Sequence, residues 1–581
     1  MLRFLKRMGL MVSLVWMMLI SVAFANVPTI AVEELRPGMT GYGKTVFQGT
    51  KIETFDVEVL GVTGSETGGY SILIRASGDN LRKNGGISQG MSGSPVYIDG
   101  RLAGAVAYGQ AFSDPNYCFL TPINQMLDML QEPDPRPSVF EGLAAKSTPL
   151  MVSGFTEDGL HHLNENLKPF GLTSYAVPTG ADALSGVGLE PGSSVGVSLV
   201  RGDMNIGAIG TVTWVGDDGH ILAFGHPFMQ HGKSDYFMTN AYIYAAVPNI
   251  QSAFKVGSLG DTLGRITEDR LSGVAGKLGE NAKIIPMYVS VTDMDRGLHQ
   301  STNVQLVTDE DLVPTLVDGV AYNAVSLAKD RKGGGTSRIR FTVTAQGEKE
   351  GPIRLRRENM FYSSKDIGKI TNSELNIALD MLMNNRFDTV KIFDVNVDVE
   401  TSAQCEVAEL VSASFPNQPV VQGGDLPIRL TFKPYRAKEF TRTIHFKVPD
   451  KQKPGPMNLI VRSGNATQWL QNALNRRNQQ NAGDEQMAGS MANAQREFKD
   501  FLSDFNTMDA NNEIVVDLAQ NLDSVEAKDG DAQSFASGVS TLLKGSPNKQ
   551  KYTMDFIISG ETGITVQVKK GSLSNVGVPH N

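Results

Sequence analysis

The segment GGISQGMSGSPVYIDGRLAGAVAYG, residues 85 to 109, carries the side chains best suited to nucleophilic chemistry. Four glycines and three serines fall within its first ten residues, and an alternating apolar stretch follows. Ser92 alone has glycines at the flanking positions, Gly90 and Gly93, that allow unusual backbone angles. The amides of Gly90 and Ser92 could then converge on one point as an oxyanion hole. The segment therefore predicts a nucleophile at Ser92 or, alternatively, a serine-rich structural turn.

A serine hydroxyl is a poor nucleophile unless a base, normally a histidine, takes its proton. His226 is the strongest candidate because it directly follows the apolar strand ILAFG, where a strand-end loop could face another barrel. The alternative is a loop histidine with no special role. His231 and His220 are weaker candidates, and His161-His162 lies in a polar helical segment and is predicted to mark a solvated face.

Two known serine loops provide templates for residues 90–95, GMSGSP. The G-x-S-x-G elbow of α/β-hydrolases needs a glycine at Ser94 and a helix after the serine, whereas Pro95 and a hairpin signal follow here. The trypsin-like loop G-D-S-G-G-P leads into a strand, and this sequence matches it at four of six positions. The hairpin signal is Asp99-Gly100, between two alternating apolar runs.

Taken together, these segments resemble the SpoIVB-type serine peptidase family. The resemblance is carried by the serine segment followed by FLTPINQML, by PGSSVGVSLVRGD, and by IGTVTWVGDDGHILAFGHPF, and it covers roughly residues 30 to 260. It implies a trypsin-like fold, Ser92 as nucleophile, His226 as general base and a polypeptide substrate. Met91 replaces the aspartate that pairs with a new amino terminus in trypsin-like zymogens, so the site is expected to form without such a cleavage.

The sequence departs from the family pattern in three respects. The serine motif precedes the histidine segment, which is the reverse of the sporulation members, and no PDZ domain is evident. The family's aspartate fifteen residues before the serine is replaced by Ser77, which leaves Asp79 as the tentative acid and Asp235 as the alternative. Two functions therefore remain open: an exported serine endopeptidase, or a catalytically silent envelope protein that binds partners or acts as a scaffold.

The expected fold is mainly β: a trypsin-like double β-barrel in permuted order, then an α+β region, a β-sandwich and a partly helical C-terminal region. Helices are expected in TPINQMLDMLQE and NSELNIALDMLMNNR. The predicted parts are a signal peptide (1–25), a barrel half with the serine motif (28–130), a barrel half with the histidine motif (150–305), an α+β region (306–395), a β-sandwich (396–462), and a helical or partly disordered tail with terminal strands (463–581).

The N-terminus and the composition set the expected compartment and partners. Basic residues, an apolar run from Met8 to Val22 and small residues at Ala23 and Ala25 predict a signal peptide and therefore export to the periplasm or outside the cell. No later segment is long and apolar enough to span a bilayer. The net charge is −9 with no basic stripe, which argues against nucleic-acid binding.

Nothing in the sequence calls for a cofactor or a metal. The eight histidines show no metal-ligand spacing. The two cysteines, Cys118 and Cys405, are far apart in the chain, and the sequence leaves open whether they pair. The C-terminal half is expected to recruit substrate or an envelope protein partner.

Overall fold

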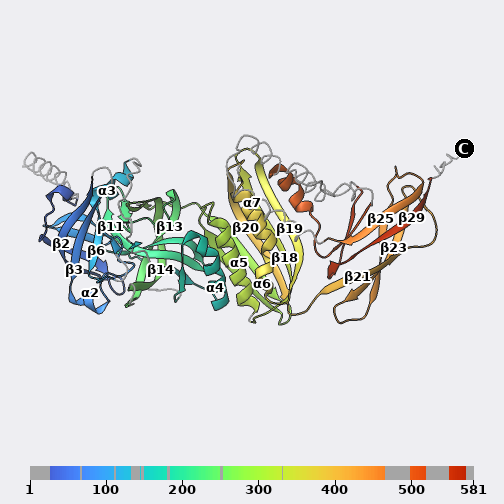
Figure 1. The fold of residues 1–581 in the computed structure, drawn as a ribbon, viewed down its shortest axis with the longest axis horizontal. Helices are drawn as coiled ribbons and strands as arrows, with labels where there is room; N and C mark the ends of the chain where they lie inside the picture. The colour runs from blue at the N-terminus through green and yellow to red at the C-terminus, as the bar shows by residue number, and fades with distance from the viewer. Residues whose placement is uncertain are drawn as a thin grey trace, which may run out of the picture. The chain divides into compact units, whose positions relative to one another are not determined.

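The computed structural model describes most of the chain, which forms two compact units (Figure 1). Unit 1 consists of residues 1–153, 174–199 and 205–283, and unit 2 of residues 154–173, 200–204 and 284–581. The described residues are 27–65, 69–109, 113–131, 144–145, 149–178, 184–248, 253–329, 331–385, 387–464, 498–518 and 548–570. The predicted signal peptide and most of the predicted tail lie outside them. Strands make up 53% of the described residues, which confirms the prediction of a mainly β fold.

The first barrel of unit 1 contains the serine motif. Its strands follow the order β4-β1-β2-β3-β6-β5, and the pairing of β4 with β5 closes the ring, with β7 added at the edge. The bounds are β1 (Thr40–Val46), β2 (Ile52–Ser65), β3 (Gly69–Ser77), β4 (Pro95–Ile98), β5 (Arg101–Gly109), β6 (Tyr117–Pro122) and β7 (Ala144–Ala145), with helices α2 (Asp79–Lys83) and α3 (Ile123–Leu127). Closure removes the exposed strand edges, so every barrel strand has two neighbours.

The predicted hairpin and the first predicted helix are both present in this barrel. Asp99 and Gly100 join β4 to β5 with φ angles of 48° and 75°, the positive values that a type I′ turn requires. Helix α3 lies within the predicted segment. The barrel is filled by inward-pointing apolar side chains such as Phe55, Ile74 and Val106. Met91 of the serine loop belongs to the same core, which fixes that loop against the barrel interior.

The second barrel of unit 1 contains the histidine motif. Its strands follow the order β10-β13-β14-β15-β12-β11, and the pairing of β10 with β11 closes this ring as well, with β8 and β9 beyond β11. The bounds are β8 (Leu150–Ser153), β9 (Ser174–Ala176), β10 (Ser194–Gly202), β11 (Asn205–Val215), β12 (His220–Ala223), β13 (Gly232–Val247), β14 (Phe254–Arg270) and β15 (Gly273–Leu278). Two six-stranded barrels are the architecture expected for a trypsin-like fold.

Unit 2 begins with an α+β region. Its strands follow the order β19-β18-β20-β16-β17, and the second predicted helix is present as α7. The long apolar helix α5 packs on β16 and β17, and α4 and α7 pack on α5. The bounds are α4 (Glu157–Leu167), β16 (Ile285–Asp293), β17 (Leu298–Leu306), α5 (Val313–Lys329), β18 (Gly335–Gly347), β19 (Gly351–Ser363), α6 (Ile367–Thr371), α7 (Ser373–Met383) and β20 (Val390–Ser402).

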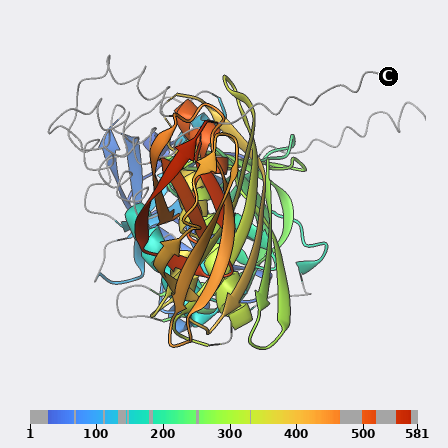
Figure 2. The ribbon, with the colours of Figure 1, turned by 90° about the vertical axis from the view of Figure 1, so that its right-hand side faces the viewer.

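Unit 2 ends with a β-sandwich (orange and red in Figure 2). One sheet has the order β24-β23-β21-β28 and the other β22-β29-β25-β26-β27, and they share one apolar core. The bounds are β21 (Val407–Ser414), β22 (Val420–Val421), β23 (Asp425–Pro434), β24 (Phe440–Lys447), β25 (Gly455–Ser463), β26 (Glu513–Leu518), β27 (Gln550–Thr553), β28 (Ile557–Ser559) and β29 (Glu561–Lys569). Strands β26 to β29 thus complete the sandwich, although the expected boundary at residue 462 separated them from it.

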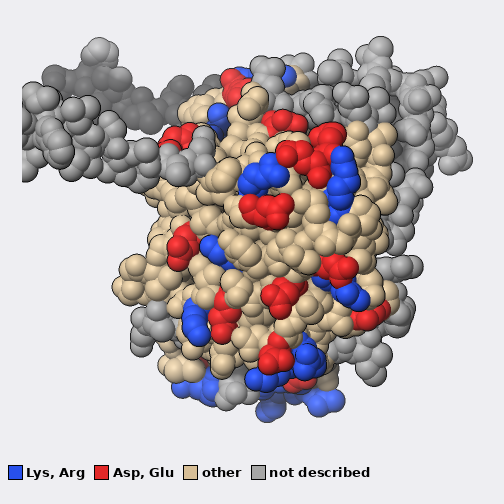
Figure 3. Space-filling view, turned by 90° about the vertical axis from the view of Figure 1, so that its left-hand side faces the viewer, with Lys and Arg blue, Asp and Glu red and all other residues tan. Residues whose placement is uncertain are grey.

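Two surface properties bear on the expected partners. On the face shown in Figure 3, acidic and basic side chains of the described residues are interspersed, and neither sign covers the face. Within the described ranges, no helix has both the length and the apolar character needed to cross a bilayer.

Candidate active site

The loop that carries Ser92 enters β4 and lies directly against the second barrel. Gly90 and Gly93 have φ angles of +91° and +90°, which only glycine adopts readily. The Thr211 hydroxyl donates to the carbonyl of Gly90 at 3.0 Å, and the Thr211 amide donates to the carbonyl of Ser92 at 2.8 Å. The serine loop is therefore held in place by β11 of the second barrel as well as by its own barrel.

Two backbone amides of this loop have no acceptor among the residues that the structure describes. They are the N–H groups of Gly90 and Ser92. The other amides from Ile87 to Ser94 all donate a hydrogen bond. The pairs are Ile87 to Pro115 O, Ser88 to Met91 Sδ, Gln89 to Ala253 O, Met91 to Ser88 O, Gly93 to Val106 O and Ser94 to Met91 O. Buried amides without a partner are rare in folded proteins. These two are the pair expected to form an oxyanion hole around Ser92.

His226 follows a tight reversal at the end of β12. Phe224 and Gly225 both have left-handed φ angles, 69° and 68°, and they turn the chain so that His226 is completely buried. Its Nδ1 is 2.8 Å from the Pro227 carbonyl oxygen, and Nε2 has no hydrogen-bond partner among the residues that the structure describes. A carbonyl oxygen only accepts, so Nδ1 carries the proton and Nε2 is left unprotonated. Burial lowers the pKa of His226 to about 4, so the imidazole is neutral at physiological pH.

The serine loop and the histidine loop are in direct contact within unit 1. A Cβ atom at Gly93 would lie 1.9 Å from the Thr211 carbonyl oxygen and 2.5 Å from the amide nitrogen of Phe224, two residues before His226. A Cβ atom at Gly225 would lie 3.1 Å from the Val106 carbonyl oxygen in the first barrel. The structure therefore brings the two predicted site segments together, although they are distant in the sequence.

The site is closed in this structure. Ser92 and His226 are both 0% exposed. Within the described part of the chain, neither the hydroxyl of Ser92 nor Nε2 of His226 has a hydrogen-bond partner, so the two are not bonded to each other. The rings of Tyr108 and Phe224 lie 6.0 and 5.8 Å from the imidazole, measured between ring centroids. A polypeptide substrate therefore reaches Ser92 only if the loops around His226 move.

Neither predicted acid is the partner of His226. Asp79 lies on α2 with its side chain 81% exposed and forms an ion pair with Arg82 at 3.4 Å. Asp235 accepts from the Lys283 amide at 3.2 Å and lies 3.5 Å from the Arg265 guanidinium. The group at Nδ1 of His226 is the Pro227 carbonyl instead. The structure thus orients the imidazole by a backbone dipole rather than by a carboxylate.

Asp269 on β14 has a role that the sequence analysis missed. Its buried carboxylate accepts from the amides of Phe228, Met229 and Gln230 at 2.7 to 2.8 Å, so it holds the loop that follows His226. Burial raises its pKa, and the amide hydrogen bonds act in the opposite direction. Asp269 is more than forty residues from His226 in the sequence, and no local pattern marks it as a loop anchor.

The other histidines have separate surroundings. His220 Nδ1 lies 2.5 Å from an Asp218 carboxylate oxygen at the β11–β12 turn, and His231 Nδ1 lies 3.3 Å from the Tyr236 hydroxyl. His161 is exposed on α4, as expected for a solvated face. For His162 that expectation is wrong, because its side chain is 13% exposed and bonds a carboxylate of α5.

Comparison with known proteins gives a family match for the N-terminal part of the chain. Residues 21–127 match the family model described as SpoIVB peptidase S55, a segment that includes the serine loop and ends before the second barrel. The resemblance to SpoIVB-type serine peptidases is thereby confirmed for this part of the chain. No curated protein and no solved structure matches the chain.

Proposed function

We propose, from the SpoIVB-type segment of residues 21–127, that the chain is a serine endopeptidase. Ser92 attacks the scissile carbonyl, and Nε2 of His226 takes the hydroxyl proton and later gives it to the leaving amine. The amides of Gly90 and Ser92 stabilise the oxyanion of the tetrahedral intermediate. Pro227 orients the imidazole through its carbonyl and keeps Nε2 unprotonated.

The observation that carries this proposal is the pair of amides without acceptors. One of these amides belongs to the proposed nucleophile Ser92 and the other to Gly90, two residues earlier. Each neighbouring amide of the loop already donates a hydrogen bond. A purely structural Gly/Ser turn gains stability by satisfying its buried amides and has no reason to leave these two unpaired. Donors held ready for a developing negative charge are worth about 3 to 4 kcal/mol in the transition state.

The proposal requires that the site opens before substrate binds. The loop after His226 is held by hydrogen bonds from its backbone amides to Asp269, and these must break when the loop moves. The polypeptide substrate would enter between this loop and the serine loop. We also propose that the protein works outside the cytoplasm, since its first 25 residues have the pattern of a signal peptide.

Two observations favour a second candidate, a catalytically silent envelope protein that binds partners or acts as a scaffold. Ser92 and His226 are completely buried, and Nδ1 of His226 faces a carbonyl rather than a carboxylate. A carboxylate stabilises the imidazolium that forms during catalysis, and its absence makes the base weaker. In this alternative the barrels and the C-terminal half serve only for binding.

Active-site labelling with a fluorophosphonate distinguishes the two candidates. The wild type is expected to label covalently, Ser92→Ala to lose all labelling, and His226→Ala to label about 100-fold more slowly, because general-base assistance is removed. Ser94→Ala is the matched control, since Ser94 is equally buried and also lacks a side-chain partner. If the folded wild type never labels, or if Ser92→Ala labels like the wild type, the peptidase proposal fails.

A further inference from the structure

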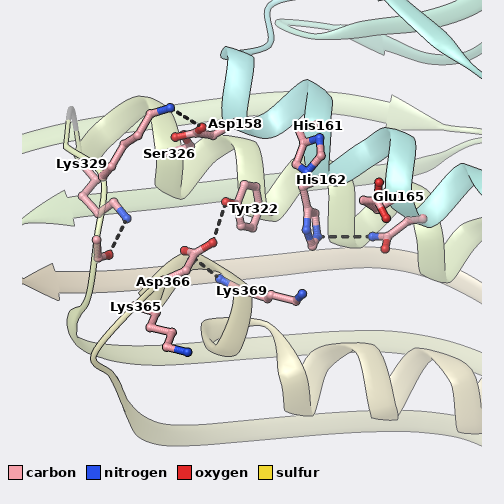
Figure 4. Close-up of a pocket in the computed structure, with 14 residues that line it drawn as sticks. Asp158, His161, His162, Glu165, Tyr322, Ser326, Lys329, Lys365, Asp366 and Lys369 are labelled. Atoms are coloured by element: carbon pink, nitrogen blue, oxygen red, sulfur yellow. Dashed lines mark hydrogen bonds and ion pairs between the residues drawn. The ribbon is translucent and has the colours of Figure 1, made fainter.

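Unit 2 contains a second, open site that is independent of the proposed peptidase chemistry. A cavity of about 390 Å³ lies beside α4, α5 and the start of α6 (Figure 4). Its volume is within the range of small-molecule sites, about 300 to 1,000 Å³. Among its lining residues are His161 and His162 from α4 and Tyr322 and Lys329 from α5. Lys365 lies just before α6, and Lys369 lies within it.

The floor of the cavity is preorganised by stacking and hydrogen bonds. The rings of His162 and Tyr322 are stacked with their centroids 4.0 Å apart. His162 Nε2 lies 2.7 Å from a carboxylate oxygen of Asp318, and the amide group of Asn166 donates to the same oxygen at 2.7 Å. These contacts fix the orientation of both rings before any ligand arrives.

The acidic side chains of the lining already have partners on the protein. Asp158 pairs with Lys332 at 2.9 Å, and Glu165 pairs with Lys168 at 2.7 Å. Asp366 accepts from the Tyr322 hydroxyl at 2.9 Å. Asp158 and Glu165 are thus paired with ammonium groups, whereas Asp366 keeps its negative charge.

Three other lysines of the lining form no ion pair within 4 Å with any residue that the structure describes. Lys329 is only 6% exposed, and its ammonium donates to a single acceptor, the Gly333 carbonyl at 3.3 Å. Lys365 and Lys369 are exposed, and neither ammonium has a hydrogen bond or an ion pair with any described residue. Burial lowers the pKa of Lys329, while the carboxylates of Asp366 and Asp158 act in the opposite direction, and a bound anion would further stabilise its charged form.

We propose that this cavity binds a small organic phosphate whose carbon part carries hydroxyl groups. Lysine ammoniums bind phosphate as point charges, and the lining has four lysines against three carboxylates. The cavity is larger than one phosphate ion needs. The carboxylates of Asp158 and Asp366 have oxygens that can accept from ligand hydroxyls, which also disfavours ligands that carry negative charge throughout.

Isothermal titration calorimetry on the chain without its signal peptide tests this proposal. Glucose 6-phosphate and glycerol 3-phosphate are the organic phosphate probes, and inorganic phosphate, glucose and citrate are the comparisons. At least one organic phosphate is expected to bind about tenfold more tightly than inorganic phosphate, while glucose gives no measurable heat. Lys365→Ala combined with Lys369→Ala is expected to weaken that binding at least tenfold.

Lys438→Ala combined with Lys451→Ala is the matched control, because both lysines are exposed in unit 2 and do not line the cavity. This variant is expected to bind like the wild type. The proposal is overturned if no phosphate probe binds, if citrate binds more tightly than the organic phosphates, or if the two double variants bind equally well. Because the substituted side chains are exposed, circular dichroism should report an unchanged fold for both variants.

Discussion

The contact between the two barrels and the cavity beside α4 each contain a histidine and a lysine that are removed from solvent. At the barrel contact, Nδ1 of His226 forms a hydrogen bond with the Pro227 carbonyl. Lys255 is completely buried, and its ammonium nitrogen lies 2.8 Å from the Thr45 hydroxyl. In the cavity, His162 meets the carboxylate of Asp318 and Lys329 lines open space. The hydrogen-bond partners given for His226 and Lys255 are uncharged, whereas His162 and Lys329 lie near carboxylates.

This difference determines which protonation states the two regions favour. Burial lowers the pKa of His226 to about 4 and that of Lys255 to about 7, so the barrel contact favours neutral groups. Burial also lowers the pKa of Lys329, but Asp366 and Asp158 act in the opposite direction. A neutral imidazole suits proton transfer, whereas charged lysines suit the binding of an ion. Three experiments can break or sharpen this comparison.

The largest effect is expected for Gly93→Ala, which should force the barrel contact apart. The new Cβ would overlap the Thr211 carbonyl oxygen, and Gly93 has a left-handed φ of +90°. The free energy of unfolding, measured by urea titration, is expected to fall by about 4 kcal/mol. Gly100→Ala is the control, since Gly100 has a similar φ of +75° and open space at Cβ, and it should cost only about 1 kcal/mol. Equal losses would mean that the contact is not tightly packed.

The second experiment measures how strongly burial keeps His226 neutral. The folded-state pKa of about 4 lies below the ordinary value of 6.5, so the unfolded chain binds a proton first as the pH falls. The free energy of unfolding should therefore drop by roughly 3 kcal/mol between pH 6.5 and pH 4, relative to His226→Gln. A flat difference between wild type and His226→Gln would show that His226 is hydrated.

The smallest of the three effects is expected for Lys255→Met. With a folded-state pKa of about 7, Lys255 binds fewer protons when folded than when unfolded between pH 7 and pH 10.5, so wild-type stability should rise with pH across that range. Removing the ammonium should abolish this rise and stabilise the protein at pH 7 by about 2 kcal/mol, after the loss of one hydrogen bond. Lys51→Met is the control, at a side chain that is 79% exposed. Destabilisation at pH 7 would mean that Lys255 is well solvated by partners.

The parts of the fold that depend on short sequence stretches were predictable. Asp99-Gly100 predicts its hairpin because few residues tolerate two positive φ angles in succession. The apolar spacing of residues 123–130 predicts α3 in the same way. The strands after residue 512 could not be assigned to the sandwich, because their partners β21 and β25 lie far earlier in the chain and strand pairing leaves no local mark.

The same division applies to the candidate site. The sequence by itself determined the loop of Ser92, since Gly90 and Gly93 allow the backbone angles that leave two amides unbonded. Only the tertiary structure decided that His226 is buried beside that loop, with the Pro227 carbonyl rather than Asp79 or Asp235 at Nδ1. Likewise, only packing brings α4 and Lys365 to one cavity. Backbone angles follow from neighbouring residues, whereas burial and the choice of hydrogen-bond partners depend on atoms that the chain brings together from distant positions.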